Sequence, residues 1–179
     1  VPFGVLLAKT QNINIFDHGS GNIGATNVAR VLGKKAGLIT LAGDVLKGWS
    51  IVFLASLFFE KSILIALAGL CVFLGHLFSI FLKFKGGKGV ATGLGMFSFV
   101  MPLPTLLSVG IFVLTLRVSG YVSLSSILAA ISLPIFGIFF RMPLPYIYLA
   151  VIVVLFTMQK HHDNIARIIN GEEVKFLKK

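Results

Sequence analysis

Charge is scarce in this sequence. Charged residues make up 12% of the 179 residues, whereas hydrophobic residues make up 56% and the mean hydropathy is +0.97. Long apolar runs separated by short polar segments exceed what the core of a soluble domain needs. This scarcity of charge excludes an ordinary soluble protein and predicts an integral membrane protein.

Cysteine is almost absent as well. The one cysteine, Cys71, can form neither an intramolecular disulfide nor a cysteine metal cluster, so we expect it to serve in packing. Residues 1–8 lack the basic start and the small-residue cleavage site of a signal peptide. We interpret them as the end of a helix whose beginning precedes Val1.

The apolar runs predict an all-α, polytopic helical bundle that forms a single membrane-embedded domain over residues 1–179. About 20 helical residues cross the hydrocarbon core of a bilayer. Three runs have that length: residues 37–59, 63–82 and 122–140. Two shorter runs reach it when flanking residues extend them into the interface: residues 105–118 and 144–158. Residues 90–101 and 1–8 bring the count to seven spans, or five on a stricter count.

The basic residues orient this bundle. Of the 16 lysines and arginines, all but Lys47, Lys61 and Arg141 fall on one side if the loop after the first helix faces the cytoplasm. Basic loops stay in the cytoplasm, so the N-terminus is predicted outside and the C-terminus inside. The same basic loops attract anionic lipid headgroups, and net charge by itself therefore identifies no substrate.

Polar residues gather in three islands on the predicted cytoplasmic side. The first reads DHGSGNIGATNVAR, residues 17–30, and its glycines allow positive φ and close approach of a ligand before a helix over residues 25–32. Its candidate phosphate-binding residues are Gly19, Ser20, Gly21, Asn22, Gly24, Thr26, Asn27 and Arg30. Alternatively, Ser20 or Thr26 caps the helix and Arg30 points to headgroups. The GxGxxG spacing here lacks the strand and βαβ unit of a dinucleotide site.

The second island, KFKGGKGVATG, places lysines and glycines at the start of the next helix. Glycine exposes backbone N–H groups and lysine adds positive charge, a combination that binds a phosphate dianion. The candidates are Lys85, Gly86, Gly87, Lys88 and Gly89. The order GxxxxGK[ST] of a nucleotide-binding P-loop is absent. The alternative is a simple glycine-rich turn whose lysines anchor two spans at the headgroups.

The third island, KHHDNIARIINGEE, continues the last helix, with Gly171 placed to end it. His161 and Asn164 lie one helical turn apart and can address the same site, and histidine accepts a proton near neutral pH. Adjacent histidines diverge on a helix, so we expect no metal site at His161 and His162 and no metal elsewhere. Within the spans, Asp44 and Lys47 are expected to pair, and His76 to be a satisfied buried histidine.

Together, GSGNIGATNVAR, GHLFSIFLKFKGGKGVATG and KHHDNIARIINGEE resemble the three signature motifs of the bacterial acyl-phosphate:glycerol-3-phosphate acyltransferases, the PlsY family. The likeness extends over nearly the whole chain. It implies a multi-pass enzyme of the bacterial cytoplasmic membrane whose site faces the cytoplasm. Such an enzyme moves a fatty acyl group from acyl phosphate to the first hydroxyl of glycerol-3-phosphate, giving lysophosphatidic acid and inorganic phosphate in the first step of phospholipid synthesis.

The resemblance also implies site residues: Ser20 and Arg30 from the first motif, the loop 86–89 from the second, and His161 and Asn164 from the third. Glu173 takes the acidic position of the family, where we expect a structural role, and His162 departs from the usual residue. With Lys88, these form the predicted catalytic set. No cofactor is expected, the surroundings are membrane lipids, no nucleic acid binds, and the oligomeric state stays open with a monomer as the simplest case.

The sequence leaves the proton acceptor undecided and allows two alternative functions to be weighed. The base that activates the hydroxyl is either His161 or a substrate phosphate, because both titrate near neutral pH. A transporter of a phosphorylated metabolite would need a polar route that reaches both faces, whereas the polar residues here gather on one side. A structural or lipid-binding protein would have no need of a glycine-rich phosphate loop beside the histidine. We therefore favour an enzyme over both.

Overall fold

The structure is a computed structural model of the chain, and it describes residues 1–176. Within that range every regular element is helical, as the composition predicts. The helices are α1 (Phe3–Lys9), α2 (Ala25–Leu32), α3 (Lys34–Phe58), α4 (Ser62–Leu77), α5 (Val90–Val100), α6 (Pro102–Ser119), α7 (Val122–Phe139), α8 (Leu144–Lys160) and α9 (His162–Ile169). Two 3₁₀ turns, η1 (Ile15–Asp17) and η2 (Ile80–Leu82), complete the set.

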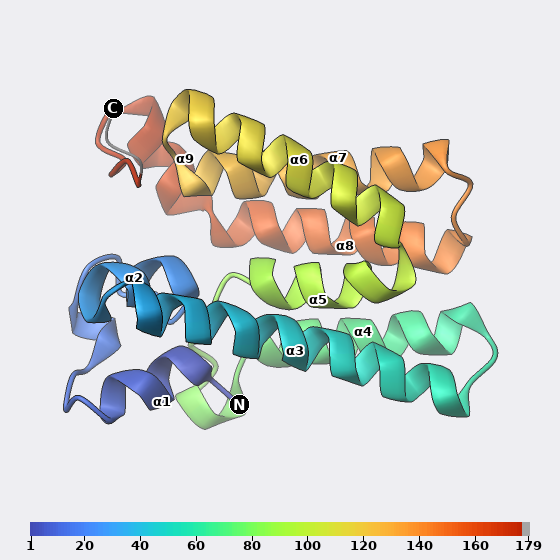
Figure 1. Cartoon of the computed structure of the whole chain (residues 1–179), viewed down its shortest axis with the longest axis horizontal. Coiled ribbons are helices and arrows are strands. Elements are labelled where there is room, and N and C mark those ends of the chain that lie inside the picture. The colour runs from blue at the N-terminus through green and yellow to red at the C-terminus, as the bar shows by residue number, and fades with distance from the viewer. Residues whose placement is uncertain (177–179) are drawn as a thin grey trace.

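The long helices lie along one axis in two groups, with the short helix α5 between them (Figure 1). The α3–α4 hairpin forms one group, and α6, α7 and α8 form the other. The helices α2 and α9 lie together at one end of the molecule, close to the described C-terminal residues. This arrangement brings segments from the start, the middle and the end of the chain to the same end of the bundle.

Helix α5 fits between the groups because glycines allow its backbone to touch that of α3. A Cβ at Gly48 would collide with the carbonyl of Thr92, and a Cβ at Gly95 would collide with the carbonyl of Val45. Small residues allow this close approach of helices in membrane proteins. The rest of α5 fills the core, where Met96 is fully buried. The central helix is therefore held close to α3, with Met96 in the core.

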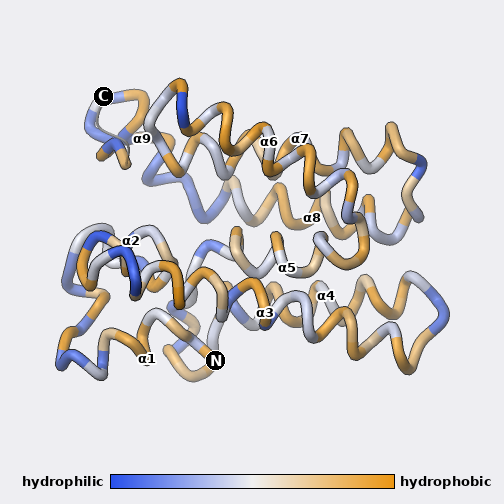
Figure 2. Tube along the Cα trace, viewed as in Figure 1, coloured by the Kyte–Doolittle hydropathy of each residue, from blue (hydrophilic) through white to orange (hydrophobic). Residues whose placement is uncertain are grey.

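Hydropathy follows this layout, with apolar stretches through the middle of the long helices and polar segments at the ends (Figure 2). Within the described residues, four helical segments are long and apolar enough to cross a bilayer: Lys34–Phe58, Ser62–Leu82, Pro102–Ser119 and Val122–Phe139. A fifth results if α8 and α9, which meet at 57°, count as one bent span. The prediction of seven spans is not confirmed, because α1 and α5 have only 7 and 11 residues.

Three local predictions need correction. The helix expected to run to residue 82 ends at Leu77, and a 3₁₀ turn follows before the glycine-rich loop. The last helix does not continue smoothly into the third island, because His161 leaves helical geometry and separates α8 from α9. Cys71 is exposed on α4 and is not part of the packed core. By contrast, Gly171 follows the end of α9 with φ of 74°, as predicted.

Candidate active site

One cavity of about 400 Å³ lies at the end of the bundle where the three islands meet, a volume typical of small-molecule sites. All the residues of the predicted catalytic set line it: Ser20, Arg30, Lys88, His161 and Asn164. Five of the other predicted residues line it as well: Asn22, Gly24, Thr26, Asn27 and Gly89. The remaining predicted residues do not: Gly19, Gly21, Lys85, Gly86 and Gly87. The three islands, far apart in the sequence, therefore share one cavity.

Within residues 1–176, four helices begin at this cavity. Their first residues all line it: Ala25 of α2, Lys34 of α3, Val90 of α5 and Val122 of α7. Helix N-termini carry unpaired N–H groups and a partial positive charge, which favour anions. The contribution of α7 is not visible in the polar islands, since the sequence at residues 122–126 is only a serine-containing apolar run.

The first island is held together by the side chain of Asn27. Its Oδ1 accepts a hydrogen bond from Ser20 N at 2.9 Å, and its Nδ2 donates to His18 O at 3.1 Å and to Asn22 O at 2.8 Å. Asn27 is only 2% exposed. The amide predicted to bind phosphate is thus used to shape the turn, and its polar atoms are already paired.

The glycines of this island divide into two kinds. Gly19 and Gly21 have φ of 61° and 65°, the left-handed geometry that the sequence predicts, but they stand behind the cavity wall. Gly24 has an ordinary φ of −75° and is the N-cap of α2, where no side chain caps the helix. The alternative in which Ser20 or Thr26 caps α2 is therefore wrong. Instead, Asn22 Oδ1 accepts from Gly24 N at 2.8 Å.

In the second island, two predicted phosphate donors are already paired. Gly86 N donates to Leu77 O and Gly87 N donates to His76 O, both at 3.2 Å. The loop is thereby fastened to the end of α4, and the hypothesis that these two N–H groups hold a phosphate must be corrected. Gly89, with φ of 83°, packs against the ring of Phe73 and starts α5.

Lys88 is the cation of this loop that reaches the cavity. Its Nζ donates to Asn164 Oδ1 on α9, so the second and third islands are in contact. Burial is the main reason that the pKa of Lys88 falls to about 8, since the neighbouring charges of Glu173 and Arg167 act in opposite directions. Lysines 83 and 85 of the same loop are exposed and do not line the cavity.

The third island contributes His161 and Asn164. His161 is 3% exposed, and its Nδ1 lies 2.8 Å from Thr157 O. A carbonyl can only accept, so Nδ1 carries the hydrogen and the neutral ring keeps a lone pair on Nε2. His162, given less weight in the sequence, is exposed and lies beside Asp163 with Nε2 at 2.9 Å from Oδ1.

Glu173 has a larger part in the site than its sequence position suggests. Its Oε1 accepts from Asn164 Nδ2 at 2.6 Å and from Ser123 Oγ at 2.7 Å, and its Oε2 accepts from Arg167 Nε at 2.8 Å. Burial raises the pKa of this carboxyl, but the hydrogen bonds outweigh burial and the net pKa is lowered. Glu173 is thus a carboxylate that joins α7 to α9.

The segment after α9 folds over the cavity. Phe176 N donates to Gly120 O at 2.8 Å, and the Phe176 side chain lines the cavity. Arg30, which is exposed, donates from one guanidinium nitrogen to Val174 O at 3.2 Å. The remaining donors of Arg30 can still bind an anion in the cavity.

Part of the cavity lining is apolar and forms the apolar wall. It consists of Leu38 and Leu41 of α3 with Phe112 and Leu116 of α6. Leu38 and Leu41 are exposed on the surface of α3, in a segment that is apolar enough to cross the membrane. The cavity therefore combines cationic groups and helix N-termini with a wall that continues towards lipid.

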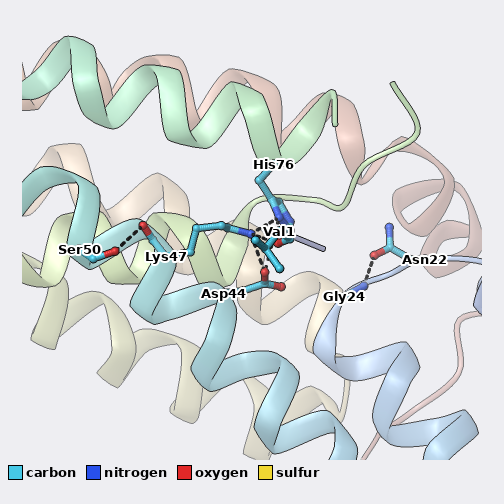
Figure 3. Close-up of polar contacts among 7 residues, drawn as sticks. All are labelled: Val1, Asn22, Gly24, Asp44, Lys47, Ser50 and His76. Carbon is cyan, nitrogen blue, oxygen red and sulfur yellow. Dashed lines mark hydrogen bonds and ion pairs between the residues drawn. The ribbon is translucent and has the colours of Figure 1, made fainter. Parts of the chain in front are cut away.

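A cluster of ionisable side chains lies deeper, between α3 and α4 (Figure 3). Lys47 Nζ is 2.6 Å from Asp44 Oδ1 and 2.9 Å from His76 Nδ1, and all three side chains are largely buried. This confirms the predicted Asp44–Lys47 pair and the buried, satisfied His76. Within residues 1–176, no three His, Cys, Asp or Glu side chains are grouped so that they could hold a metal ion.

Sequence comparison gives one consistent family. The family described as "Glycerol-3-phosphate acyltransferase" matches residues 1–171. The glycerol-3-phosphate acyltransferase of Trichlorobacter lovleyi is 47% identical over 177 residues, covering 98% of this chain and 91% of the relative. That of Geotalea daltonii is 46% identical over 176 residues, with the same two coverages.

Solved structures agree with the sequence comparison. The crystal structure of PlsY (YgiH), an integral membrane glycerol 3-phosphate acyltransferase, in its glycerol 3-phosphate form is 37% identical with a TM-score of 0.95. The match covers 98% of this chain and 88% of that one. The lysophosphatidic acid form of the same protein gives a TM-score of 0.92 with the same identity and coverages. The chain belongs to the PlsY family of integral membrane glycerol-3-phosphate acyltransferases.

Proposed function

We propose that the protein transfers a fatty acyl group from acyl phosphate to the sn-1 hydroxyl of glycerol-3-phosphate. The products are lysophosphatidic acid and inorganic phosphate, and the reaction is the first step of bacterial phospholipid synthesis. The observation that carries this proposal is the cavity itself, whose lining combines four helix N-termini, Lys88 and Arg30 with an apolar wall. Such a site suits two phosphate groups and one acyl chain.

The phosphate groups are assigned by position. Lys88 and the first N–H groups of α5 hold the phosphate of the donor, because Val90 and Ala91 line the cavity beside Lys88. Arg30, with Ser20 and the N-terminus of α2, holds glycerol-3-phosphate. The relative crystallised in a glycerol 3-phosphate form supports a site for this acceptor in the family fold.

The acyl chain lies along the apolar wall formed by Leu38, Leu41, Phe112 and Leu116. Burial of apolar surface contributes about 0.8 kcal/mol for each methylene, so a long chain gains most of its affinity there. The reacting carbonyl then sits where the wall meets the polar residues. This geometry lets a donor enter from the membrane and an acceptor enter from the aqueous side.

The transfer needs little acid catalysis. The hydroxyl oxygen of the acceptor bonds to the acyl carbon, and the bond from that carbon to the phosphate oxygen breaks. Phosphate leaves with its charge stabilised by Lys88 and the start of α5. Phosphate is a much weaker base than an alkoxide, which makes it a good leaving group. The positive cavity therefore lowers the barrier mainly by stabilising charge.

The hydroxyl proton passes to His161 Nε2 or to a phosphate oxygen. The Nδ1 contact with Thr157 leaves Nε2 as the acceptor of a neutral ring, which is the form a general base requires. Substitution of His161 by glutamine, which keeps a polar side chain but not the base, separates the two routes. If His161 is the base, turnover falls about 100-fold. If a phosphate is the base, turnover stays within a fewfold of the wild type.

We place the polar end of the bundle at the cytoplasmic face of the bacterial inner membrane, with the N-terminus outside and the C-terminus inside. The basic residues of the second island and of α9 lie at that end, and the positive-inside rule supports this orientation. Single cysteines at residues 85 and 61 of a Cys71→Ser protein would test it in intact cells. A membrane-impermeant thiol reagent should label residue 61 and spare residue 85, and the reverse pattern would contradict the orientation.

The donor is tested with purified protein in detergent micelles. Labelled glycerol-3-phosphate is supplied with palmitoyl phosphate, palmitoyl-CoA or palmitoyl acyl carrier protein, and lysophosphatidic acid is measured. Of the three donors, we expect only palmitoyl phosphate to give product. Product only from a thioester would contradict the proposed donor, and the Lys88→Met variant serves as the matched inactive control.

A further inference from the structure

The buried cluster of Asp44, Lys47 and His76 touches the glycine-rich loop. Lys47 bridges the other two side chains, at 2.6 Å to Asp44 Oδ1 and 2.9 Å to His76 Nδ1 (Figure 3). Lysine can only donate, so His76 Nδ1 accepts and its Nε2 carries the hydrogen. This contact fixes the orientation of an imidazole ring that would otherwise be free to turn over.

The orientation of that ring matters because Gly87 packs directly against it. A Cβ at Gly87 would collide with His76 Nε2, whereas a Cβ at Gly86 would collide with the backbone carbonyls of His76 and Leu77. The N–H groups of both glycines donate to those carbonyls at 3.2 Å. The path of the loop is therefore set by the end of α4 and by the plane of the His76 ring.

Lys88 follows Gly87 directly, and its Nζ meets Asn164 of α9. A shift of the backbone at Gly87 would move the Lys88 side chain in the cavity, where Asp44 and His76 also line the wall. We propose that His76, held by Lys47 and Asp44, is a positioning residue that sets the place of Lys88 in the active site. The importance of Lys88 for catalysis rests on the proposed function, but its placement does not.

The charges in this cluster give the arrangement its stiffness. Charged side chains inside a spanning helix are costly unless they are paired, and paired ones are held firmly. The lysine donates to Asp44 of α3 and His76 of α4, and also to Val1 O at 3.4 Å, so it fixes the two helices to each other as well as the ring. An apolar contact at the same place would leave the ring free to rotate about its long axis.

Alanine substitutions at Gly87 and Gly86 test which of the two contacts depends on the His76 ring. Gly87→Ala should lower kcat/KM about 100-fold, since displacements of about 1 Å have effects of that size. Adding His76→Ala removes the colliding ring, so we expect the double variant to be no worse than His76→Ala alone. Gly86→Ala is the matched control, because its collision is with backbone carbonyls and the His76→Ala change cannot relieve it. If the losses in kcat/KM of Gly87→Ala and His76→Ala simply add in the double variant, the proposal is overturned.

A second measurement reports on Lys88 without requiring activity. The wild-type protein and the His76 variants are acetylated with trace acetic anhydride across a pH range, and labelling at Lys88 is read by mass spectrometry. In wild type the midpoint should lie near the pKa of about 8, whereas in His76→Ala it should move upward as Lys88 reaches solvent. His76→Asn keeps an acceptor near the Nδ1 position and should give an intermediate midpoint. An unchanged midpoint in His76→Ala would overturn the proposal.

These outcomes are distinguishable from failure of the proposed function. If the wild-type protein formed no lysophosphatidic acid from palmitoyl phosphate, the labelling of Lys88 would still show whether His76 places it. If His76→Ala does not fold, as judged by size-exclusion chromatography in detergent, the His76→Asn and Gly87→Ala variants provide the same comparison.

Discussion

The two glycine-rich turns at the cavity have similar composition but are built differently. The first turn, residues 18–24, is shaped by side chains, because Asn27 makes three hydrogen bonds to its backbone and Asn22 Oδ1 accepts a fourth from Gly24 N. The second turn, residues 83–89, is shaped by backbone carbonyls at the end of α4 and by the His76 ring. Glycine therefore serves two purposes here, positive φ at Gly19 and close packing at Gly87.

This difference separates structure from chemistry at the site. In the first turn the amide of Asn27 is used for structure, and the cation that follows, Arg30, is exposed. In the second turn the glycines are used for structure, and the adjacent cation, Lys88, is mostly buried and has a lowered pKa. We expect substitutions in the second turn to have the larger direct effect on the reaction. Substitutions in the first turn should act mainly by disturbing its fold.

The largest expected effect is at Lys88. Replacement by methionine keeps most of the side-chain volume and removes the charge, so kcat/KM with palmitoyl phosphate should fall about 100- to 1,000-fold. Steady-state kinetics in detergent micelles measure this. Lys83→Met, an exposed lysine of the same loop, should keep wild-type rates. Equal losses in both variants would mean that general loop charge, and not Lys88, is responsible.

Asn27→Ala should have the next largest effect, on stability as well as rate. It removes three hydrogen bonds from a buried group, and each contributes about 1 kcal/mol. We expect a loss of about 3 kcal/mol and a lowered thermal midpoint in detergent, accompanied by lower activity. Asn27→Asp keeps the acceptor for Ser20 N but loses both donated bonds, so its stability should lie between that of the wild type and that of Asn27→Ala. A wild-type thermal midpoint in both would contradict this account of the first turn.

The pH dependence sharpens the comparison further. Lys88 is protonated below its pKa of about 8 and neutral above it, so kcat/KM should fall as pH rises through 8, by up to tenfold per pH unit. The Asn27→Asp variant should keep this midpoint, because the first turn does not contact Lys88. Profiles corrected for spontaneous hydrolysis of acyl phosphate give the measurement. A flat profile between pH 7 and 10 would contradict the role assigned to the Lys88 cation.

The smallest expected effect is at Glu173. Its lowered pKa means that the carboxylate stabilises the folded protein above its unfolded pKa, and that this stability is lost as pH falls through the folded pKa. Glu173→Gln keeps the size but weakens the contact with Arg167, so turnover at neutral pH should fall about tenfold. The difference in thermal midpoint between this variant and wild type should shrink as pH falls through the lowered pKa of Glu173. A difference in thermal midpoint that is the same throughout a falling pH series would argue for shape and not charge.

Much of this molecule was predictable from local patterns. Helix α2 begins and ends at the predicted residues, 25 and 32, because a glycine-rich turn and Gly33 bound it on either side. The convergence of the three islands followed from placing them on one side of the membrane, and the cavity confirms that Ser20, Lys88 and His161 meet.

Other features depend on contacts between distant segments, which no local pattern contains. Hydrophobicity alone makes residues 90–101 resemble a short span, and only the folded structure shows that α5 packs closely on α3 through Gly48 and Gly95 and lies between the two helix groups. Gly86 N and Gly87 N donate to carbonyls at the end of α4. The sequence does not show where that helix ends, because the apolar run continues to residue 82. The contact between Glu173 and Ser123 could not be predicted either, because Ser123 is 50 residues away.

The position of Glu173 also has a consequence for biogenesis. Ribosomes make the chain from the N-terminus, so α1 to α9 are complete before this carboxylate exists. Asn164, Arg167 and Ser123 gain their shared partner only when the residues after α9 turn back onto α7. A partly translated protein in the bilayer would thus hold its helices before these three side chains have their shared partner, and the reaction centre would reach its final geometry only after the last turn closes.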